Sequence, residues 1–296
     1  MNTSEHADRF TDLRPLLFTI AYEILGSATD SDDVLQESYL RWAEVDLAEV
    51  HDARAYLARL VTRQALNALR SQARRREEYV GPWLPEPLLI DATDPSADVV
   101  LAESVSMAMM VVLETLTPDE RAVFVLREVF GFGHDEIAAT VGRSTAAVRQ
   151  MAHRAREHVQ SRRKRFDPVD PKRSLELTAQ FFATASTGDV DALLAMLAPD
   201  VVWTADSDGK ASAARRPIVG ADKVARLVMG LLRLAGDGTR VEPACYNGAP
   251  ALVLFVDDAL VGVITVEITD GVITHFYAMR NPEKLVGVTV AREIAR

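Results

Sequence analysis

Four polar side chains on one face of a short helix are the clearest candidates for chemistry, namely hydrogen bonding to DNA bases. They are Arg149, Gln150, His153 and Arg154. In a helix of 3.6 residues per turn, steps of one, four and five positions keep all four on one side. Arginine can donate two hydrogen bonds to guanine, and glutamine can pair with adenine. The pattern predicts a helix that enters the major groove of DNA.

The residues around this helix predict a helix-turn-helix, a framework that presents such a face to DNA. Gly142 supplies a tight turn, and Ser144 can cap the second helix, where Ser144 and Thr145 are further candidate contacts. The apolar inner faces of the two helices contain Ile137, Ala138, Val141, Val148 and Met151. A helical hairpin with a purely structural role would have the same pattern, so this alternative stays open here.

The charges of the chain are unevenly distributed. Its 296 residues have a formal net charge of −10, which argues against binding nucleic acid over the whole surface. The segment 143–165, however, contains eight basic residues and one acid, and Arg74, Arg75 and Arg76 form a second basic run. Such runs can replace the counterions of DNA phosphates, although a solvated face or a linker would also explain them.

Composition excludes several classes of protein. A hydrophobic content of 48% and a charged content of 26% are ordinary for a globular chain. The single cysteine, Cys245, cannot form a disulfide within the chain, and residues 1–12 lack the pattern of an export leader. No run approaches the roughly 18 apolar residues of a spanning helix. We therefore expect a cytoplasmic protein with no membrane partner.

The spacing of apolar residues predicts two all-α domains followed by an α+β domain. Helical spacing covers 13–76 and 99–165, and four prolines between 79 and 98 predict a linker. After residue 167 the pattern changes to helices followed by strands. The expected units are 1–78, 79–98, 99–166 and 167–296.

Local signals indicate where helices begin. Gly26 and Ser27 interrupt the first helical run, and Asp30 or Ser31 is the expected N-cap of the next helix. Thr117 followed by Pro118 predicts another helix start, because threonine caps well and proline suits the first turn.

Two segments in this order resemble a bacterial sigma factor of the extracytoplasmic-function (ECF) class. Ser31–Glu44 resembles the region-2 helix that binds the β′ clamp of RNA polymerase, and Leu116–Glu157 resembles the region-4 domain that binds the −35 promoter element. The resemblance implies that Asp33, Gln36 and Glu37 contact the polymerase core. It implies −35 contacts for Ser144, Thr145, Arg149, Gln150, His153 and Arg154.

A third segment, Tyr56–Glu77, resembles the family's helix that melts and captures the −10 element. By that resemblance Asn67 contacts the −10 DNA, and Arg70 with Arg74, Arg75 and Arg76 contacts nearby phosphates. Asn67 stands where the family commonly has aspartate, and Arg63 stands where many members have asparagine.

The final third resembles the SnoaL-like branch of the nuclear-transport-factor-2-like fold, in which a curved sheet wraps around helices as a cone. The resemblance rests on Phe181–Asp206. Apolar periodicity predicts helices at 175–186, 190–197 and 221–234 and strands at 201–205, 251–256, 261–268 and 272–279. Hairpin turns are expected at 257–258 and 270–271.

Enzymes occur among the relatives of this fold, so a catalytic cone is an alternative. Acid–base chemistry would need a carboxylate or imidazole in an apolar pocket, for which Asp206, Asp208 and His275 are the candidates. Because a fold does not carry a function with it, we expect no catalytic residues, no cofactor and no metal.

Three short motifs resemble a sigma-factor subgroup with a fused SnoaL-like domain that contacts and modulates the sigma domains. The residues implied in this contact are Trp83, Leu84, Pro85 and Glu86 of the linker, Asp206, Asp208, Gly209 and Lys210, and Asn281, Pro282, Glu283, Lys284 and Leu285. Exposure of Trp83 and Leu84 would be costly unless a docked cone covered them. A proline-rich spacer buried on its own domains is the alternative.

We therefore expect an ECF sigma factor that binds RNA polymerase core and promoter DNA and is modulated by its own cone. One alternative is a bifunctional protein with an isomerase-like or cyclase-like cone. Another is a repressor that uses the helix-turn-helix alone, against which the acidic segment 32–37 argues.

Overall fold

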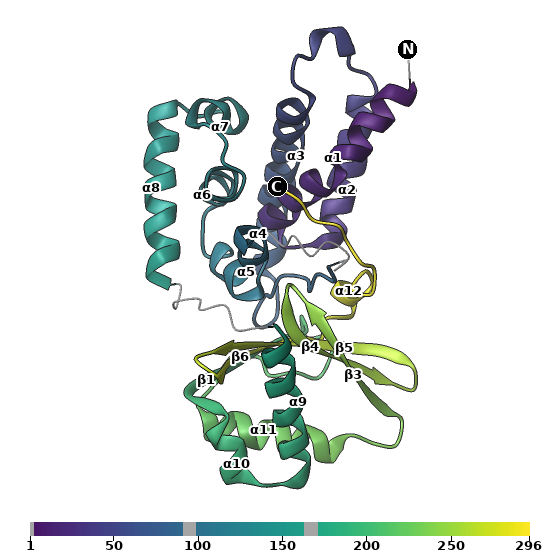
Figure 1. Ribbon diagram of the computed structural model, residues 1–296, viewed down its shortest axis with the longest axis vertical. Helices are drawn as coiled ribbons and strands as arrows, with labels where there is room; N and C mark the ends of the chain where they lie inside the picture. The colour runs from purple at the N-terminus through teal and green to yellow at the C-terminus, as the bar shows by residue number, and fades with distance from the viewer. Residues whose placement is uncertain (1–2, 91–98, 163–170) are drawn as a thin grey trace.

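The molecule is elongated, with helices at one end and an α+β domain at the other (Figure 1). This computed structural model describes residues 3–90, 99–162 and 171–296, without the side chains of residues 3, 73–76, 99 and 171. The first helical domain contains α1 (Thr3–Leu25), α2 (Ala28–Trp42), a 3-10 turn (Leu47–Glu49) and α3 (Ala53–Glu77). The second contains α4 (Val99–Ser104), α5 (Met107–Leu113), α6 (Pro118–Phe124), a π turn (Val125–Val129), α7 (His134–Val141) and α8 (Thr145–Arg162).

The α+β domain, called the cone domain below, completes the predicted fold class, which is confirmed. Its helices are α9 (Pro171–Thr187), α10 (Val190–Ala195), α11 (Ala221–Leu234) and α12 (Pro282–Leu285). Its strands are β1 (Leu197–Asp206), β2 (Ile218–Val219), β3 (Thr239–Tyr246), β4 (Ala249–Val256), β5 (Ala259–Thr269) and β6 (Val272–Met279). No helix within the described residues is long and apolar enough to cross a membrane.

The start of α2 differs from the sequence prediction. Ser27, rather than Asp30 or Ser31, is the N-cap, and its hydroxyl accepts a hydrogen bond from the Asp30 amide. The carboxylate of Glu86 accepts hydrogen bonds from the amides of Ala28 and Thr29. Because Glu86 lies far along the chain, local pattern could not reveal that it completes this helix start.

Two other local predictions are confirmed. Thr117 caps α6 in a capping box with Glu120, and Pro118 occupies the first turn. Gly142 adopts a left-handed conformation (φ 71°) between α7 and α8, and the Ala147 amide donates to the Ser144 hydroxyl at 3.2 Å. The helix-turn-helix therefore forms as expected.

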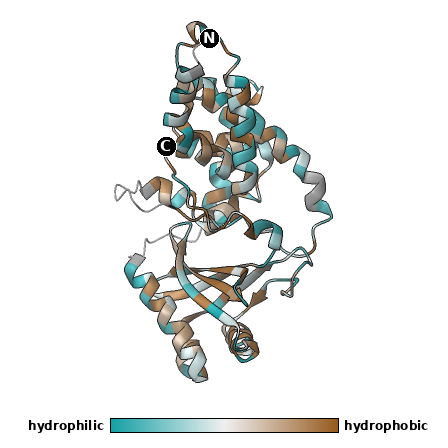
Figure 2. Ribbon diagram, turned by 90° about the vertical axis from the view of Figure 1, so that its right-hand side faces the viewer, coloured by the Kyte–Doolittle hydropathy of each residue, from teal (hydrophilic) through white to brown (hydrophobic). Residues whose placement is uncertain are grey.

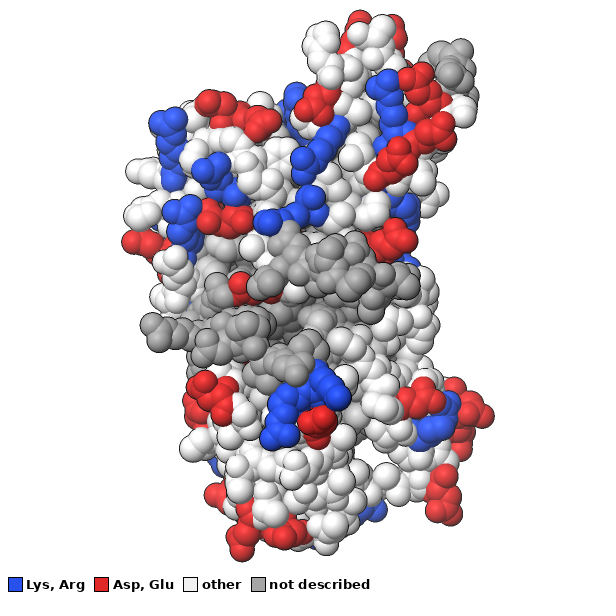
Figure 3. Space-filling model, in the orientation of Figure 1, with Lys and Arg blue, Asp and Glu red and all other residues white. Residues whose placement is uncertain are grey.

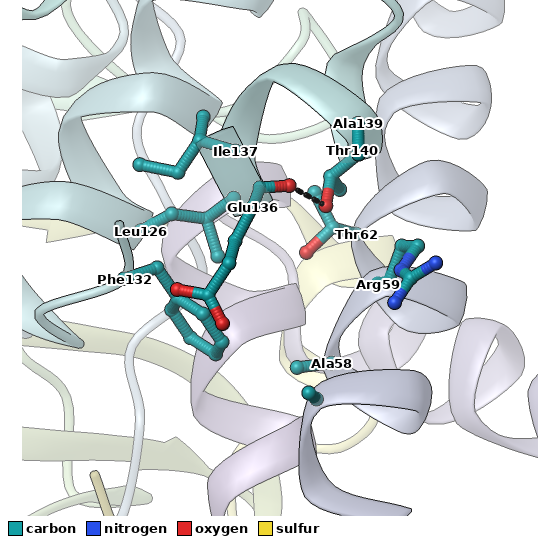
Figure 4. A pocket seen from close by; sticks show the side chains of 10 residues that line it. Ala58, Arg59, Thr62, Leu126, Phe132, Glu136, Ile137, Ala139 and Thr140 are labelled. Atoms are coloured by element: carbon teal, nitrogen blue, oxygen red, sulfur yellow. Dashed lines mark hydrogen bonds between the residues drawn. The ribbon is translucent and has the colours of Figure 1, made fainter. Parts of the chain in front are cut away.

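The two helical domains share one hydrophobic core. Residues of α1 and α3, such as Leu17 and Val61, belong to the same buried cluster as Ile137 of α7 and Val148 of α8. Figure 4 shows part of this junction, where Arg59 and Thr62 of α3 face Thr140 of α7 across a cavity of about 40 Å³. The helical domains are thus packed against each other along their lengths.

The cone domain is built on a curved six-stranded sheet in the order β2-β1-β6-β5-β4-β3. The β1–β6 pair is parallel, and the other neighbouring pairs are antiparallel. Helices α9, α10 and α11 lie on the side of the sheet away from the helical domains (Figure 1). Phe181 of α9, Val224 of α11 and Phe276 of β6 share the core between helices and sheet.

The other face of the sheet is apolar as well. Along β6, Phe276 and Ala278 face the helices, whereas Tyr277 and Met279 join a second cluster with linker Leu84. Figure 2 shows the hydrophobic colouring of the strands. Apolar residues on both faces of a sheet require cover on both sides, and the linker and second helical domain provide the second cover.

The predicted elements of the cone are confirmed to within a few residues, but β3 was not predicted. Most of its residues are exposed, as expected for an edge strand, so it lacks the alternation of apolar residues that marks a half-buried strand. The hairpin turns at 257–258 and 270–271 have the expected positive φ angles.

Candidate promoter interface and interdomain contact

The candidate −35 residues lie on the exposed side of α8. Arg149, Gln150, His153 and Arg154 are all exposed, whereas Val148, Met151, Ala152, Ala155 and Val159 are buried. At the start of the helix Ser144 acts as the cap, and the Thr145 hydroxyl donates to Asp135 at 2.6 Å. The face has the polarity and exposure that a groove-binding helix needs.

The candidate polymerase contacts lie on the exposed side of α2. Asp33, Gln36 and Glu37 are exposed, and Glu37 is paired with Arg41 at 2.7 Å. Asp33, Glu37 and the −10 candidate Asn67 line one groove of about 410 Å³ between α2 and α3. The two sets of candidates are therefore neighbours. The side chains of Arg74, Arg75 and Arg76 lie outside the described residues.

Several candidate DNA contacts are engaged in ion pairs within the protein. Asp119 of α6 binds Arg70 of α3 at 2.6 Å and Arg143 of the helix-turn-helix at 2.7 Å. Arg154 of α8 lies 3.2 Å from Glu120. Figure 3 shows basic and acidic side chains interleaved over the helical domains. One carboxylate thus joins the −10 candidate Arg70 to the first residue of the basic segment 143–165.

Hydrogen bonds from arginine side chains to main-chain carbonyl groups also join the helical domains. The guanidinium of Arg63 on α3 donates to the carbonyls of Ala139 and Thr140, at 2.6 Å and 3.1 Å. These carbonyls belong to the C-terminal turn of α7, where a cation is favoured by the helix dipole. Arg121 of α6 is buried and bonds the Glu23 carbonyl of α1 at 2.7 Å and the Glu114 carboxylate at 2.6 Å.

Glu23 is a buried acid at the same junction. Its Oε1 accepts a hydrogen bond from Ser104 of α4 at 2.6 Å, and its Oε2 has no hydrogen-bond partner among the described residues. Burial raises the pKa of Glu23 to about 8, although Ser104 and Arg121 act in the opposite direction. The carboxyl group is therefore mainly protonated at neutral pH.

We expect Glu23→Gln to flatten the pH dependence of stability. Between about pH 4.5 and 8, Glu23 holds its proton in the folded state and loses it in the unfolded state. The free energy of unfolding therefore falls as pH rises, by about 1.4 kcal/mol per pH unit. Urea unfolding at several pH values in this window measures the slope for wild type, Glu23→Gln and the exposed control Asp12→Asn. Parallel curves for wild type and Glu23→Gln would contradict the assignment.

The linker is held by a buried carboxylate of the cone. Asp206 is fully buried at the end of β1 and accepts hydrogen bonds from the Leu84 amide at 2.7 Å and from the Tyr79 hydroxyl. The Lys284 ammonium bonds Asp206 at 2.8 Å and the Leu84 carbonyl at 2.7 Å. It also lies 3.2 Å from the centroid of the Trp83 ring. Burial lowers the pKa of Lys284, which Asp206 opposes.

Other predicted residues support this linker–cone contact. The Asn281 amide donates to the Tyr79 hydroxyl at 2.8 Å and its side chain caps α12, whose first residue is Pro282. Asp208 accepts from the Val80 amide at 3.1 Å. Lys210 binds Asp208 and Glu283 at 2.8 Å and 2.7 Å. A side chain at Gly209 (φ 66°) would contact Val80, and Leu285 is buried with Leu84.

Two predicted linker residues face the first helical domain. Glu86 is buried and caps α2, as described above, and its amide donates to the Gly26 carbonyl at 2.8 Å. Pro85 is buried, and its Cβ would lie 3.6 Å from a Cβ added at Gly26. The linker is therefore covered by the cone on one side and by the first helical domain on the other.

Asn247, in the turn between β3 and β4, was missed from the sequence. It is 1% exposed with φ 53°, and its Oδ1 accepts from the Leu88 amide at 2.8 Å. Its Nδ2 donates to the Tyr22 hydroxyl and to the Val105 carbonyl, both at 2.8 Å. One side chain thus joins the cone to the linker and to both helical domains. The dipeptide Asn247-Gly248 is typical of a hairpin turn, but it gives no indication that Asn247 contacts the linker or the helical domains.

The C-terminal tail was also missed. Arg292 binds Asp32 of α2 at 2.6 Å, and its amide donates to the Leu89 carbonyl at 2.9 Å. The Ala295 amide donates to the Thr19 hydroxyl of α1 at 3.1 Å. The tail thus lies against the helix that carries the candidate polymerase contacts. It contains no periodic pattern that could have indicated a docking segment.

The catalytic candidates of the cone do not meet in one pocket. Asp206 is covered by the linker, and Asp208 is engaged with Lys210 and Val80. His275 bonds the Thr204 hydroxyl at 2.9 Å and stacks on Tyr277, beside the second helical domain. These positions support structural roles for all three groups.

The comparisons with known proteins agree with this arrangement. The models for sigma-70 region 2 and sigma-70 region 4 match residues 9–75 and 106–159. The ECF RNA polymerase sigma factor SigJ of Mycobacterium tuberculosis is 40% identical over 291 residues, which cover 94% of this chain and 92% of SigJ. The probable ECF sigma factor SigI of that organism is 32% identical over 276 residues, or 92% of each chain.

A solved structure extends the likeness to the three-dimensional fold. The crystal structure of Mycobacterium tuberculosis SigJ matches with a TM-score of 0.77 at 35% identity, covering 96% of this chain and 99% of that chain. The similarity therefore includes both helical domains and the cone domain. On this evidence the chain belongs to the ECF RNA polymerase sigma factors.

Proposed function

We propose that the cone domain and linker restrain this sigma factor by stabilising the packed arrangement of its two helical domains. In this proposal α8 binds the −35 element, Asn67 and Arg70 act at the −10 element, and the exposed acidic side of α2 binds the β′ clamp of RNA polymerase. The observation that carries the proposal is the buried linker, which bonds the cone through Asp206 and the first helical domain through Glu86.

The distance between the two promoter elements supports a restraining role for the cone, because the helical domains must separate to reach both elements. The −35 and −10 elements are about 25 base pairs apart, or roughly 85 Å of B-form DNA. Helices in one core lie only about 10 Å apart. Because α3 and α7 share a core here, the helical domains must separate before each can occupy its own element. A cone that binds the packed arrangement better than the separated one shifts the population toward the packed state.

The internal ion pairs support the same conclusion. Asp119 competes with DNA phosphates for Arg70 and Arg143, and Glu120 competes with them for Arg154. Arg292 of the tail pairs with Asp32, next to the candidate polymerase contact Asp33. Exposed pairs of this kind are weak, about 0–1 kcal/mol each, so polymerase and promoter can displace them once the domains separate.

Transcription with purified core polymerase on a promoter library tests the proposal. We expect full-length protein to direct promoter-dependent transcripts, and versions ending at Arg165 or at Val288 to produce more of them. The point variant Arg292→Met separates loss of the Arg292–Asp32 pair from loss of the whole tail. Equal transcript levels from all versions would remove the regulatory role. DNA binding without transcription from any version would favour the repressor alternative.

A further inference from the structure

The cone domain contains a partly open cavity that the contact with the linker does not use. It has a volume of about 490 Å³, within the usual range for small-molecule sites. Its walls come from the helix-covered face of the sheet, α9, α11 and the loop before β2. The lining is mainly apolar and includes Phe182, Trp203, Leu227, Leu252, Leu254 and Ile264.

Among the described residues that line this cavity, Arg280 has the one charged side chain. Its guanidinium makes no hydrogen bond or ion pair with any described residue, and its Nε is buried without a partner. Burial lowers the pKa of Arg280. A partly buried guanidinium without an anion beside it is unfavourable, because nothing replaces the water that its Nε has lost.

The neighbouring strand is shaped to accommodate this arginine. A Cβ added at Gly262 of β5 would lie 2.8 Å from Cδ of Arg280 and 3.1 Å from the Met279 carbonyl oxygen. Any larger residue at position 262 would therefore displace the arginine. The absence of a side chain there keeps Arg280 at the cavity wall.

We propose that this cavity binds an apolar molecule with one carboxylate, such as a medium-chain fatty acid, with the carboxylate on Arg280. The apolar lining suits a hydrocarbon chain, and a guanidinium can bind a carboxylate through two parallel hydrogen bonds. Among the described lining residues Ser212 and Thr239 are the remaining side chains with hydroxyl groups, so the lining suits a single polar head.

The site lies next to the residues that hold the linker. The Arg280 amide donates to the Asp206 carbonyl at 2.7 Å, and the next residue is Asn281, which binds Tyr79. Occupancy therefore acts on the segment that holds the linker. Any effect of the bound molecule on transcription rests on the proposed function. Binding of the molecule does not, so a binding experiment can fail or succeed independently of the transcription experiment.

Calorimetric titration of the full-length protein with decanoate and with 1-decanol tests the proposal. We expect decanoate to bind at least about tenfold more tightly than decanol, because only decanoate can pair with Arg280. Arg280→Met should lose this preference while retaining decanol binding. Arg233→Met, on the exposed side of α11, is the matched control and should behave as wild type. Ala213→Trp should fill the cavity and weaken binding of both probes.

Three results would overturn the proposal: no binding of either probe to wild type, equal affinity of wild type for both, or an unchanged decanoate preference in Arg280→Met. If Arg280→Met does not fold, the wild-type ratio and Ala213→Trp still decide. Thermal unfolding of each variant, recorded without ligand, identifies any loss of folded protein.

Discussion

Asp206→Ala is expected to weaken the docking of the cone on the linker by about 3–5 kcal/mol, the usual cost of breaking a buried ion pair. The substitution leaves the Lys284 ammonium buried with the Leu84 carbonyl and two aromatic rings, and leaves the Leu84 amide without its acceptor. Hydrogen exchange at the Leu88 amide measures how often the cone separates from the linker. This amide bonds Asn247 and not Asp206, so the substitution does not remove its own hydrogen bond.

Two further variants separate charge from packing. Asp206→Asn with Lys284→Met removes both charges together and should recover much of the loss, since no unpaired ion remains buried. Asp208→Asn removes the charge of a carboxylate in the same turn that binds the exposed Lys210, keeps a residue that tolerates the positive φ, and should cost at most about 1 kcal/mol. Similar losses for Asp206→Ala and Asp208→Asn would show that the buried pair is not the main contact.

Asn247→Ala is expected to have an effect of comparable size. The change leaves the Leu88 amide and the Val105 carbonyl buried without partners, at about 1–3 kcal/mol each. It also places alanine at a positive φ, which costs about 1 kcal/mol. Because these bonds join the cone to both helical domains, loss of Asn247 should raise exchange at the Leu84 amide, which bonds Asp206 instead.

The positive φ angle requires its own controls. Asn247→Gly removes the side-chain hydrogen bonds without the cost of a Cβ at positive φ, so it should retain most of the effect. Asp270→Ala makes the comparable change in the exposed turn between β5 and β6, at φ 52°. A loss as large for Asp270→Ala as for Asn247→Ala would assign the effect to backbone strain.

Much of the fold follows from periodicity. The capping box at Thr117, the turn at Gly142 and the helix α11 were predicted from local pattern, because each depends on residues a few positions apart. The three motifs around Trp83, Asp206 and Lys284 were identified through a family resemblance, and their residues do lie together. No local pattern would have brought these segments together.

The contacts that were missed depend on distant parts of the chain. Glu23 lies three positions after Ile20 on the inner face of α1, so an acid on an apolar face was a usable signal. Asn247 and Arg292 carried no such signal, because their partners are remote in sequence. The edge strand β3 lacked the alternation that marks a half-buried strand.

The position of the linker within the chain has a consequence for newly made protein. Leu84 and Leu88 are translated early, but their partners are translated late: Asp206 and Lys284 for Leu84, and Asn247 for Leu88. At about 5–20 residues per second, the ribosome needs on the order of ten seconds to proceed from residue 165 to Lys284. Both helical domains therefore emerge before the cone can hold them. Each new molecule passes through an interval in which its helical domains are complete but have none of these contacts with the cone, and the rate of synthesis sets the length of that interval.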